Sequence, residues 1–303
     1  MVFDMGWHTQ NATVGTGHAG TRGWTGYSWN RKLIKDPAKL IQDLKDDHVY
    51  VVLNEHPHDG LRPHDDAYPM FIRDLGADTL KNGVPLFDAG NPEYMKAFMK
   101  HAHQESDQMG VAFWWLDWQQ DYLYPYVRGT SMRHLPWLNK IYYDYSARNN
   151  LRGAGFSRWA GWGDHRHPIQ FSGDAVANWE LLRFEIDLTT TSGNAGCFFW
   201  AHDLGGFYGG DDAELYTRWT QFGLLNSSLR IHSVYDEKLD RRPWLWGDKE
   251  EEAMKRIYHL RSQLMPYIYS SVHQCYEDMI PLNRGLYLEY PSDEKAYQLS
   301  LIH

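Results

Sequence analysis

The segment Val111-Ala112-Phe113-Trp114-Trp115-Leu116-Asp117 decides the fold class, because six consecutive apolar residues end in a carboxylate. An apolar run of this length without alternation is typical of a strand that is buried on both faces. A helix is predicted before it, since Asn91-Pro92 can begin a helix and Gly110 can end one. A buried strand that follows a helix favours a parallel sheet covered by helices.

The alternation of strands and helices continues in both directions from this segment. Asp36 and Pro37 predict the start of a helix that precedes a strand over 49–54. Further strands are predicted over 1–7, 155–158, 169–174, 197–203 and 282–288, and helices over 179–190, 212–224 and 250–276. The pattern gives seven strands of an α/β protein and predicts a (β/α)8 TIM barrel.

The chain of 303 residues is long enough for this barrel, which takes about 250 residues. A strand is predicted from Met1 onward, and it corresponds to the second strand of the barrel. We therefore expect the first barrel strand to be missing and the barrel to be incomplete at its N-terminus. Residues 1–303 would then form one catalytic barrel domain. A doubly wound sheet is the alternative, but it gathers fewer strand ends around one site.

Composition excludes several classes of protein. The net charge of -9 and the lack of a basic run argue against nucleic acid as a partner. No apolar stretch reaches the roughly 18 residues that cross a bilayer, so no membrane association is expected. The two cysteines, Cys197 and Cys275, are too few for a disulfide framework or a structural zinc site. The sequence does not determine the cellular compartment of the protein.

Polar residues stand where the predicted strands end. They are Asp4, Asn54, Asp117, Arg158, Asp174 and Asp203. Catalytic residues of a (β/α)8 barrel lie at the carboxyl ends of its strands. The strand ends therefore predict one shared pocket that holds several carboxylates and an arginine.

Two of these carboxylates suit a nucleophile and a general acid/base, the pair that glycoside hydrolysis requires. Asp117 ends the most apolar strand between Trp115 and Trp118, and Arg158 is a plausible partner for its carboxylate. Asp174 follows Gly173 and can face a leaving group. For a single aspartate, a helix cap or a structural ion pair would be the simpler interpretation.

Six motifs, in order along the chain, resemble glycoside hydrolase family 31, whose members include α-glucosidases and α-xylosidases. They are Asn54–Pro57, Trp115–Gln120, Arg158–Asp174, His202–Phe207, Leu229–Ser233 and Pro281–Leu286. The resemblance implies a retaining α-glycoside hydrolase that acts at the non-reducing end of an α-linked sugar, through a covalent glycosyl-enzyme intermediate. It implies no metal and no cofactor, and it implies flanking β-domains in a longer parent chain.

The resemblance also implies a role for each matching residue. Asp117 matches the nucleophile and Asp174 the acid/base, whereas His202 is expected to pack or to orient its neighbour. Sugar ligands are expected at Asp4, Arg158, Asp203 and His232. Apart from the resemblance, Trp29, Trp115 and Trp118 are expected as further contacts, because the apolar face of an indole suits a sugar ring, although Trp29 could equally pin its loop to the barrel. Gln120 stands where the family often has glutamate, which leaves the identity of the sugar open.

Two other interpretations stay open. The segments His56-Pro57-His58-Asp59 and Asp164-His165-Arg166-His167 could serve a metal-dependent barrel hydrolase. Alternatively, the chain is an inactive sugar-binding fragment, because an open barrel lacks one wall of the pocket. The linkage, the choice between hydrolysis and transglycosylation, and the oligomeric state are not determined by the sequence.

Overall fold

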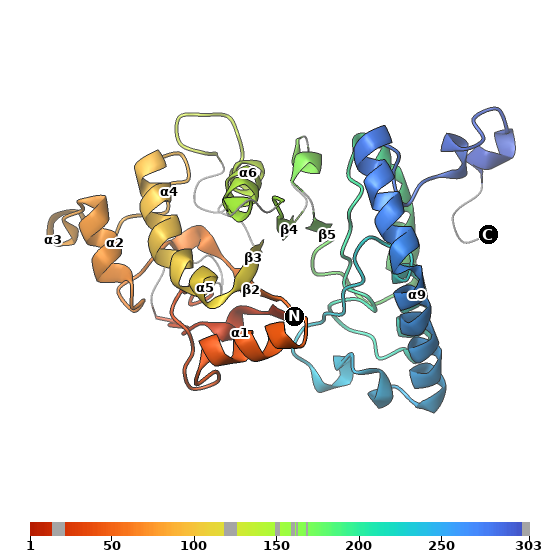
Figure 1. Cartoon of the computed structure of the whole chain (residues 1–303), viewed down its shortest axis with the longest axis horizontal. Helices are drawn as coiled ribbons and strands as arrows, with labels where there is room; N and C mark the ends of the chain where they lie inside the picture. Colours follow the sequence, from red (N-terminus) through yellow and green to blue (C-terminus); the bar gives the residue numbers. More distant parts are fainter. Residues whose placement is uncertain are drawn as a thin grey trace. The chain divides into compact units, whose positions relative to one another are not determined.

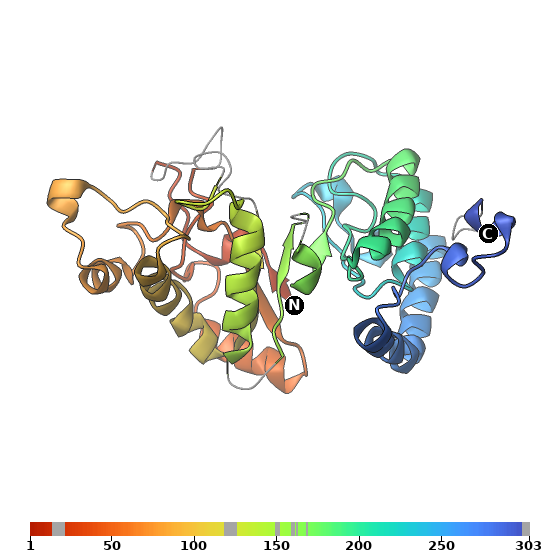
Figure 2. The same cartoon turned by 90° about the horizontal axis from the view of Figure 1, so that it is seen from above.

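The computed structural model describes residues 1–13, 22–117, 126–148, 152–158, 161, 163–167 and 169–298. The chain divides into two compact units, residues 1–167 and residues 168–303. In Figures 1 and 2 the first unit runs from red to green and the second from green to blue. Each unit has its own helices and its own buried core, so each is described by itself.

The first unit is built on parallel strands that neighbour one another in chain order. Its described strands are β1 (Val2–Phe3), β2 (Val51–Glu55), β3 (Val111–Leu116) and β4 (Phe156–Arg158). Glu55 pairs with Leu116, and Leu116 pairs with Ser157. The carboxyl ends of β2, β3 and β4 therefore reach the same edge of the sheet.

Helices separate the strands, as the sequence predicts. They are α1 (Pro37–Asp46), α2 (Tyr68–Leu75), α3 (Thr79–Asn82), α4 (Pro92–Phe98), α5 (Gln104–Met109) and α6 (His134–Ser146). The Asp36 side chain caps α1 by accepting a hydrogen bond from the Lys39 amide at 3.0 Å. The helix predicted before β3 is confirmed, but a π-helical segment over Met99–His103 separates α4 from α5.

An aromatic cluster forms the centre of the first core. Phe98 of α4 is completely buried, and its ring lies within 5.2–6.0 Å of the rings of Phe87, Tyr27, His103 and Tyr94. Most of these pairs meet edge to face, which is a favoured geometry for aromatic rings. The cluster therefore fixes α4 in the first core, and His103 connects it to Glu55 at the end of β2.

The second unit places three helices after a short strand. Its elements are β5 (Gln170–Phe171), α7 (Trp179–Ser192), α8 (Ala213–Gly223) and α9 (Asp248–Asp278). Its core joins residues of α7 and α8 with Leu204. Asn178 and Asp212 cap α7 and α8, because each side chain accepts an amide hydrogen bond from the first turn. All three helices agree with the sequence prediction to within about two residues.

Three predicted strands need correction. Residues 1–7 form only β1 followed by a 3-10 turn at Met5–Trp7, and residues 197–203 form a single bridge between Trp200 and Gln170. The predicted strand over 282–288 is wrong, because Leu286–Leu288 is a 3-10 helix. There the Leu288 and Tyr290 amides donate to carbonyls within the same turn, which leaves no ladder with a neighbouring strand. The described residues thus contain five strands rather than seven.

No helix in the described ranges combines the length and the apolar character needed to cross a bilayer.

The aromatic cluster gives a prediction for stability. Replacing Phe98 with alanine removes a completely buried ring, so we expect the free energy of unfolding to fall by about 3–5 kcal/mol. Urea denaturation followed by circular dichroism measures this change. Tyr50→Ala is the matched control, because that ring is 64% exposed, and it should change stability by less than about 1 kcal/mol. Similar losses in both variants would contradict the assignment of Phe98 to the core.

Candidate active site

Three neighbouring strands of the first unit supply the surroundings of Asp117. The Asp117 amide continues the pairing of β3 with β2 by donating to the Glu55 carbonyl at 3.0 Å. Arg158, the last residue of β4, places its Nε 2.7 Å from Asp117 Oδ1. Asn54 of β2 donates from its side-chain amide to Asp117 Oδ2 at 3.4 Å. The carboxylate is thus oriented on both oxygens while its side chain stays 14% exposed.

A buried histidine lies beside the same carboxylate. His56 Nε2 is 3.6 Å from Asp117 Oδ2, and the His56 ring meets the edge of the Trp24 ring at a centroid distance of 5.2 Å. Burial lowers the pKa of His56 to about 4, although the Asp117 charge opposes this shift. His56 is therefore neutral near pH 7, and Arg158 supplies the positive charge in contact with Asp117.

Asp4 lies next to this group along the sheet. It follows β1, its side chain is exposed, and it caps the Met5–Trp7 turn by accepting from the Met5 amide at 2.7 Å. The Trp7 indole donates to the Asn54 carbonyl at 2.7 Å, which ties the turn to the end of β2. Asp4 is thus held at the strand edge that carries Asp117.

The tryptophans named from the sequence lie in different surroundings. Trp29 is buried against Trp7 at a ring distance of 5.0 Å and donates to the Ser106 hydroxyl at 3.1 Å. Trp115 is buried and stacks on Phe156 at 5.2 Å. Both rings pack in the first unit, and sugar contact by either one stays a prediction. Trp118 lies outside the described residues.

The second unit carries the other predicted site residues. Asp174 follows β5 through Gly173, whose φ of 93° lies in the left-handed region, and the Tyr208 hydroxyl donates to Asp174 Oδ2 at 3.5 Å. Asp203 is buried and forms a close ion pair with Arg230. His232 is half-buried, with its ring 5.2 Å from the ring of Phe207.

Backbone hydrogen bonds hold the segments of this second group together. The Phe207 amide donates to the Ala175 carbonyl at 2.7 Å, and the Leu204 amide donates to the Arg230 carbonyl at 3.3 Å. Gly206 has a φ of 84°, and a Cβ on it would lie 2.6 Å from the Ala177 backbone. Gly206, the second glycine of His-Asp-Leu-Gly-Gly-Phe, is therefore needed for the close approach of the Asp174 and Asp203 segments.

Sequence reasoning placed Asn54 at a strand end of the predicted pocket but gave it no role, and it missed His56 and Arg230. Asn54 and His56 contact Asp117, and Arg230 contacts Asp203. All three lie within motifs noted in the sequence, so their motif neighbours were the available signal. Glu185 is a different case, because nothing in its helical surroundings distinguishes it from a surface residue of α7, yet it is completely buried.

The prediction that the His202 ring packs inside the protein is confirmed. Its ring is completely buried and stacks on Trp200 with an interplanar angle of 5°. His202 is the residue directly before Asp203 in the chain. Of the two cysteines, Cys275 is buried, Cys197 is half-buried, and both are free thiols.

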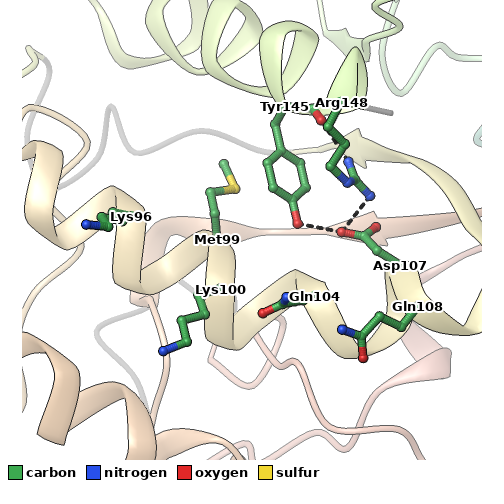
Figure 3. A pocket seen from close by; sticks show the side chains of 8 residues that line it. All are labelled: Lys96, Met99, Lys100, Gln104, Asp107, Gln108, Tyr145 and Arg148. Atoms are coloured by element: carbon green, nitrogen blue, oxygen red, sulfur yellow. Dashed lines mark hydrogen bonds and ion pairs between the residues drawn. The ribbon is translucent and has the colours of Figure 1, made fainter. Parts of the chain in front are cut away.

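A pocket of about 570 Å³ lies elsewhere in the first unit, between α4–α5 and the end of α6 (Figure 3). Asp107 points into it and accepts from the Tyr145 hydroxyl at 2.5 Å and from Arg148 Nη2 at 2.7 Å. These contacts pair three polar side chains of the wall with one another. The pocket holds none of the predicted site residues, so no chemistry is assigned to it.

The metal-hydrolase alternative has no ligand set in the described ranges. Among those residues, no group of three or more His, Cys, Asp or Glu side chains is arranged to hold a metal ion. In particular, His58 contacts Asp59 at 3.4 Å and Asp59 contacts Arg62 at 3.4 Å, so this carboxylate is already paired with an arginine.

Comparison with known proteins gives a consistent result. A family model described as the glycosyl hydrolases family 31 TIM-barrel domain matches residues 1–271. A probable glucan 1,3-alpha-glucosidase of Arabidopsis thaliana is 36% identical over 135 residues, which are 45% of this chain and 14% of that protein. An alpha-xylosidase of Emericella nidulans is 30% identical over 163 residues, 53% of this chain and 20% of that protein.

Solved structures show the same fold. A family 31 dextranase of Flavobacterium johnsoniae, complexed with glucose, superposes with a TM-score of 0.75 at 21% identity. The match covers 98% of this chain and 40% of the dextranase. The chain therefore spans less than half of that protein, and a still smaller part of the two curated relatives is matched.

The buried imidazole of His56 predicts a pH dependence of stability. Its folded pKa of about 4 lies below the ordinary value of 6.5, so between these values the unfolded chain binds the proton and the folded chain does not. The stability that neutral His56 provides is full above pH 6.5 and is lost as the pH falls toward 4.

We expect His56→Asn to reduce the loss of unfolding free energy between pH 7 and pH 4.5 by about 2 kcal/mol. Denaturant titrations at the two pH values measure this loss for parent and variant. His48→Asn is the control, because His48 is exposed on the same unit. Equal acid sensitivity in the parent and His56→Asn would show that His56 is not buried in its neutral form.

Proposed function

The chain belongs to glycosyl hydrolase family 31, and we propose that it is a retaining α-glycoside hydrolase that acts at the non-reducing end of an α-linked sugar. The observation that carries the proposal is the Asp117 carboxylate at the end of β3. Arg158 holds it at 2.7 Å, a neutral histidine lies beside it, and the side chain remains partly open to solvent. Such a carboxylate suits a nucleophile, because the contacting arginine favours its negative charge and fixes its direction.

The proposed reaction has two displacements. In the first, an Asp117 oxygen attacks the anomeric carbon while the bond to the leaving oxygen breaks, and Asp174 gives its proton to that oxygen. In the second, Asp174 takes a proton from water, whose oxygen attacks the anomeric carbon and releases Asp117. Two inversions at one carbon return the α configuration.

Neighbouring polar groups are proposed to bind the sugar. Asp4, Asp203 and His232 would accept hydrogen bonds from hydroxyls, and Arg158 would donate from its guanidinium group. Arg230 orients Asp203 and thereby supports the same set of contacts.

The names of the relatives support a class of substrate. One is a probable glucan 1,3-alpha-glucosidase and one an alpha-xylosidase, so we propose an α-linked glucoside or xyloside. Because the chain matches only a part of each relative, flanking β-domains and a barrel completed by a further strand also stay proposals.

Asp117→Ala tests the nucleophile. We expect it to lower kcat by roughly 10⁴-fold or more on the aryl α-glycoside that the parent cleaves best, from a panel of glucoside, xyloside and galactoside. A 2-deoxy-2-fluoro glycosyl fluoride should add one glycosyl unit to the parent, seen by mass spectrometry, and none to Asp117→Ala. Asp43→Ala is the control, since Asp43 is exposed on α1. A variant that still forms the adduct would refute the assignment.

Asp174→Ala tests the acid/base. Substrates with poor leaving groups should lose roughly 10²–10⁴-fold in rate, whereas activated aryl glycosides, which need little protonation, should lose much less in their first displacement. Asp187→Ala, an exposed aspartate of α7, is the control. Equal losses on both kinds of substrate would refute the role of Asp174.

The stereochemistry of the product tests the two-step course. Proton NMR taken before mutarotation should show the α-anomer first. A β-anomer would point to inversion, for which the two carboxyl groups would be about 6.5–9.5 Å apart rather than about 5–5.5 Å.

A further inference from the structure

A completely buried carboxyl group lies at the centre of the second unit. Glu185 projects from α7, and both of its oxygens accept hydrogen bonds. The Ser172 hydroxyl donates to Oε1 at 2.7 Å, and the Trp219 indole of α8 donates to Oε2 at 2.8 Å. One side chain thus connects two helices with the segment that leads from β5 to Asp174.

The same carboxyl group faces His202. Glu185 Oε1 is 3.6 Å from His202 Nδ1, and His202 Nε2 is 2.7 Å from the Thr189 hydroxyl. The Thr189 hydroxyl donates its hydrogen to the Glu185 carbonyl at 2.6 Å, so it accepts from Nε2. His202 therefore carries its proton on Nε2 and presents a bare Nδ1 to Glu185.

A bare nitrogen beside this carboxyl favours the protonated form of the acid. Burial, supported by the Asp203 charge, raises the pKa of Glu185 to about 7, whereas the two donors Ser172 and Trp219 oppose the shift. Burial and the Arg230 charge lower the pKa of His202 to about 3. The pair can therefore stay buried near neutral pH without a full ion pair, whose desolvation would be costly.

The residues that contact Glu185 lie close in the chain to two proposed site residues. Ser172 is two residues before Asp174, and only Gly173 separates them. His202 is the residue directly before Asp203. The proposed acid/base and a proposed sugar ligand are thus each linked to Glu185 through a residue close by in the chain.

We propose that Glu185 is a positioning residue that sets the direction of Asp174 through Ser172 and of Asp203 through His202. This inference rests on the proposed function for its kinetic consequence, but its structural content can be measured without substrate. An apolar residue could fill the same space at less cost, but it would not connect the two segments. Displacements of about 1 Å can cost roughly 10²-fold in rate.

Two variants test the proposal in the full chain. Ser172→Ala removes the donor next to Asp174 with a minimal change in volume, and Glu185→Gln keeps the shape of the buried group. Ser270→Ala and Glu214→Gln are matched controls, because both residues are exposed on other helices of the second unit. Thermal unfolding first establishes which variants are folded. If Glu185→Gln is not folded, Ser172→Ala carries the test.

The kinetic readout is the dependence on leaving group. For poor leaving groups, kcat should fall at least about tenfold in Ser172→Ala and Glu185→Gln while KM changes less than about threefold. On activated aryl glycosides the loss should stay below about threefold, because protonation by Asp174 contributes little there. A general loss of folded protein would lower both rates equally, and equal lowering would overturn the proposal.

The second readout is amide hydrogen exchange at 173–175. We expect exchange there to be about tenfold faster in both variants than in the parent and the two controls. Unchanged exchange at 173–175 would overturn the proposal whatever the kinetics. If the parent cleaves no glycoside, the proposed function fails, and the exchange result still decides whether Glu185 positions the segment.

Discussion

Parallel pairing of β2, β3 and β4 is the constraint on which the surroundings of Asp117 depend. Because Glu55 lies opposite Leu116 and Leu116 opposite Ser157, the next residues of the three strands emerge at one edge. Arg158 and Asn54 then reach Asp117 without any special loop. A shift of one residue in either pairing would turn these side chains to the opposite face of the sheet.

In both units, a buried carboxyl group forms hydrogen bonds at or next to the end of a strand. In the first unit Glu55 accepts hydrogen bonds from Tyr27 at 3.1 Å and Tyr142 at 2.9 Å and contacts His103 at 3.0 Å. In the second unit Glu185 accepts from Ser172 and Trp219. A buried carboxyl group without partners would cost several kcal/mol, so these networks fix their surroundings as long as every member stays paired.

The local elements show where sequence reasoning succeeds. The caps at Asp36 and Asn91 and the C-terminal glycine at 110 are short-range signals, and the structure has helix ends at each. The predicted strand over 282–288 failed for the opposite reason, since a strand forms only where a neighbour offers a ladder. The burial of Trp29 and Trp115 likewise depends on what packs against each ring rather than on the ring itself.

The sequence by itself determined the alternation of strands and helices, the family and the polar residues at the strand ends, because these are properties of neighbouring residues and of ordered motifs. Tertiary structure alone decided that Asn54 and His56 also touch Asp117 and that Glu185 is buried. Asn54 and Arg158 stand 63 and 41 positions from Asp117 in the chain, and only the paired strands bring them into contact. The charge and the pKa of a side chain depend on such distant neighbours and on exclusion of water, which no local pattern encodes.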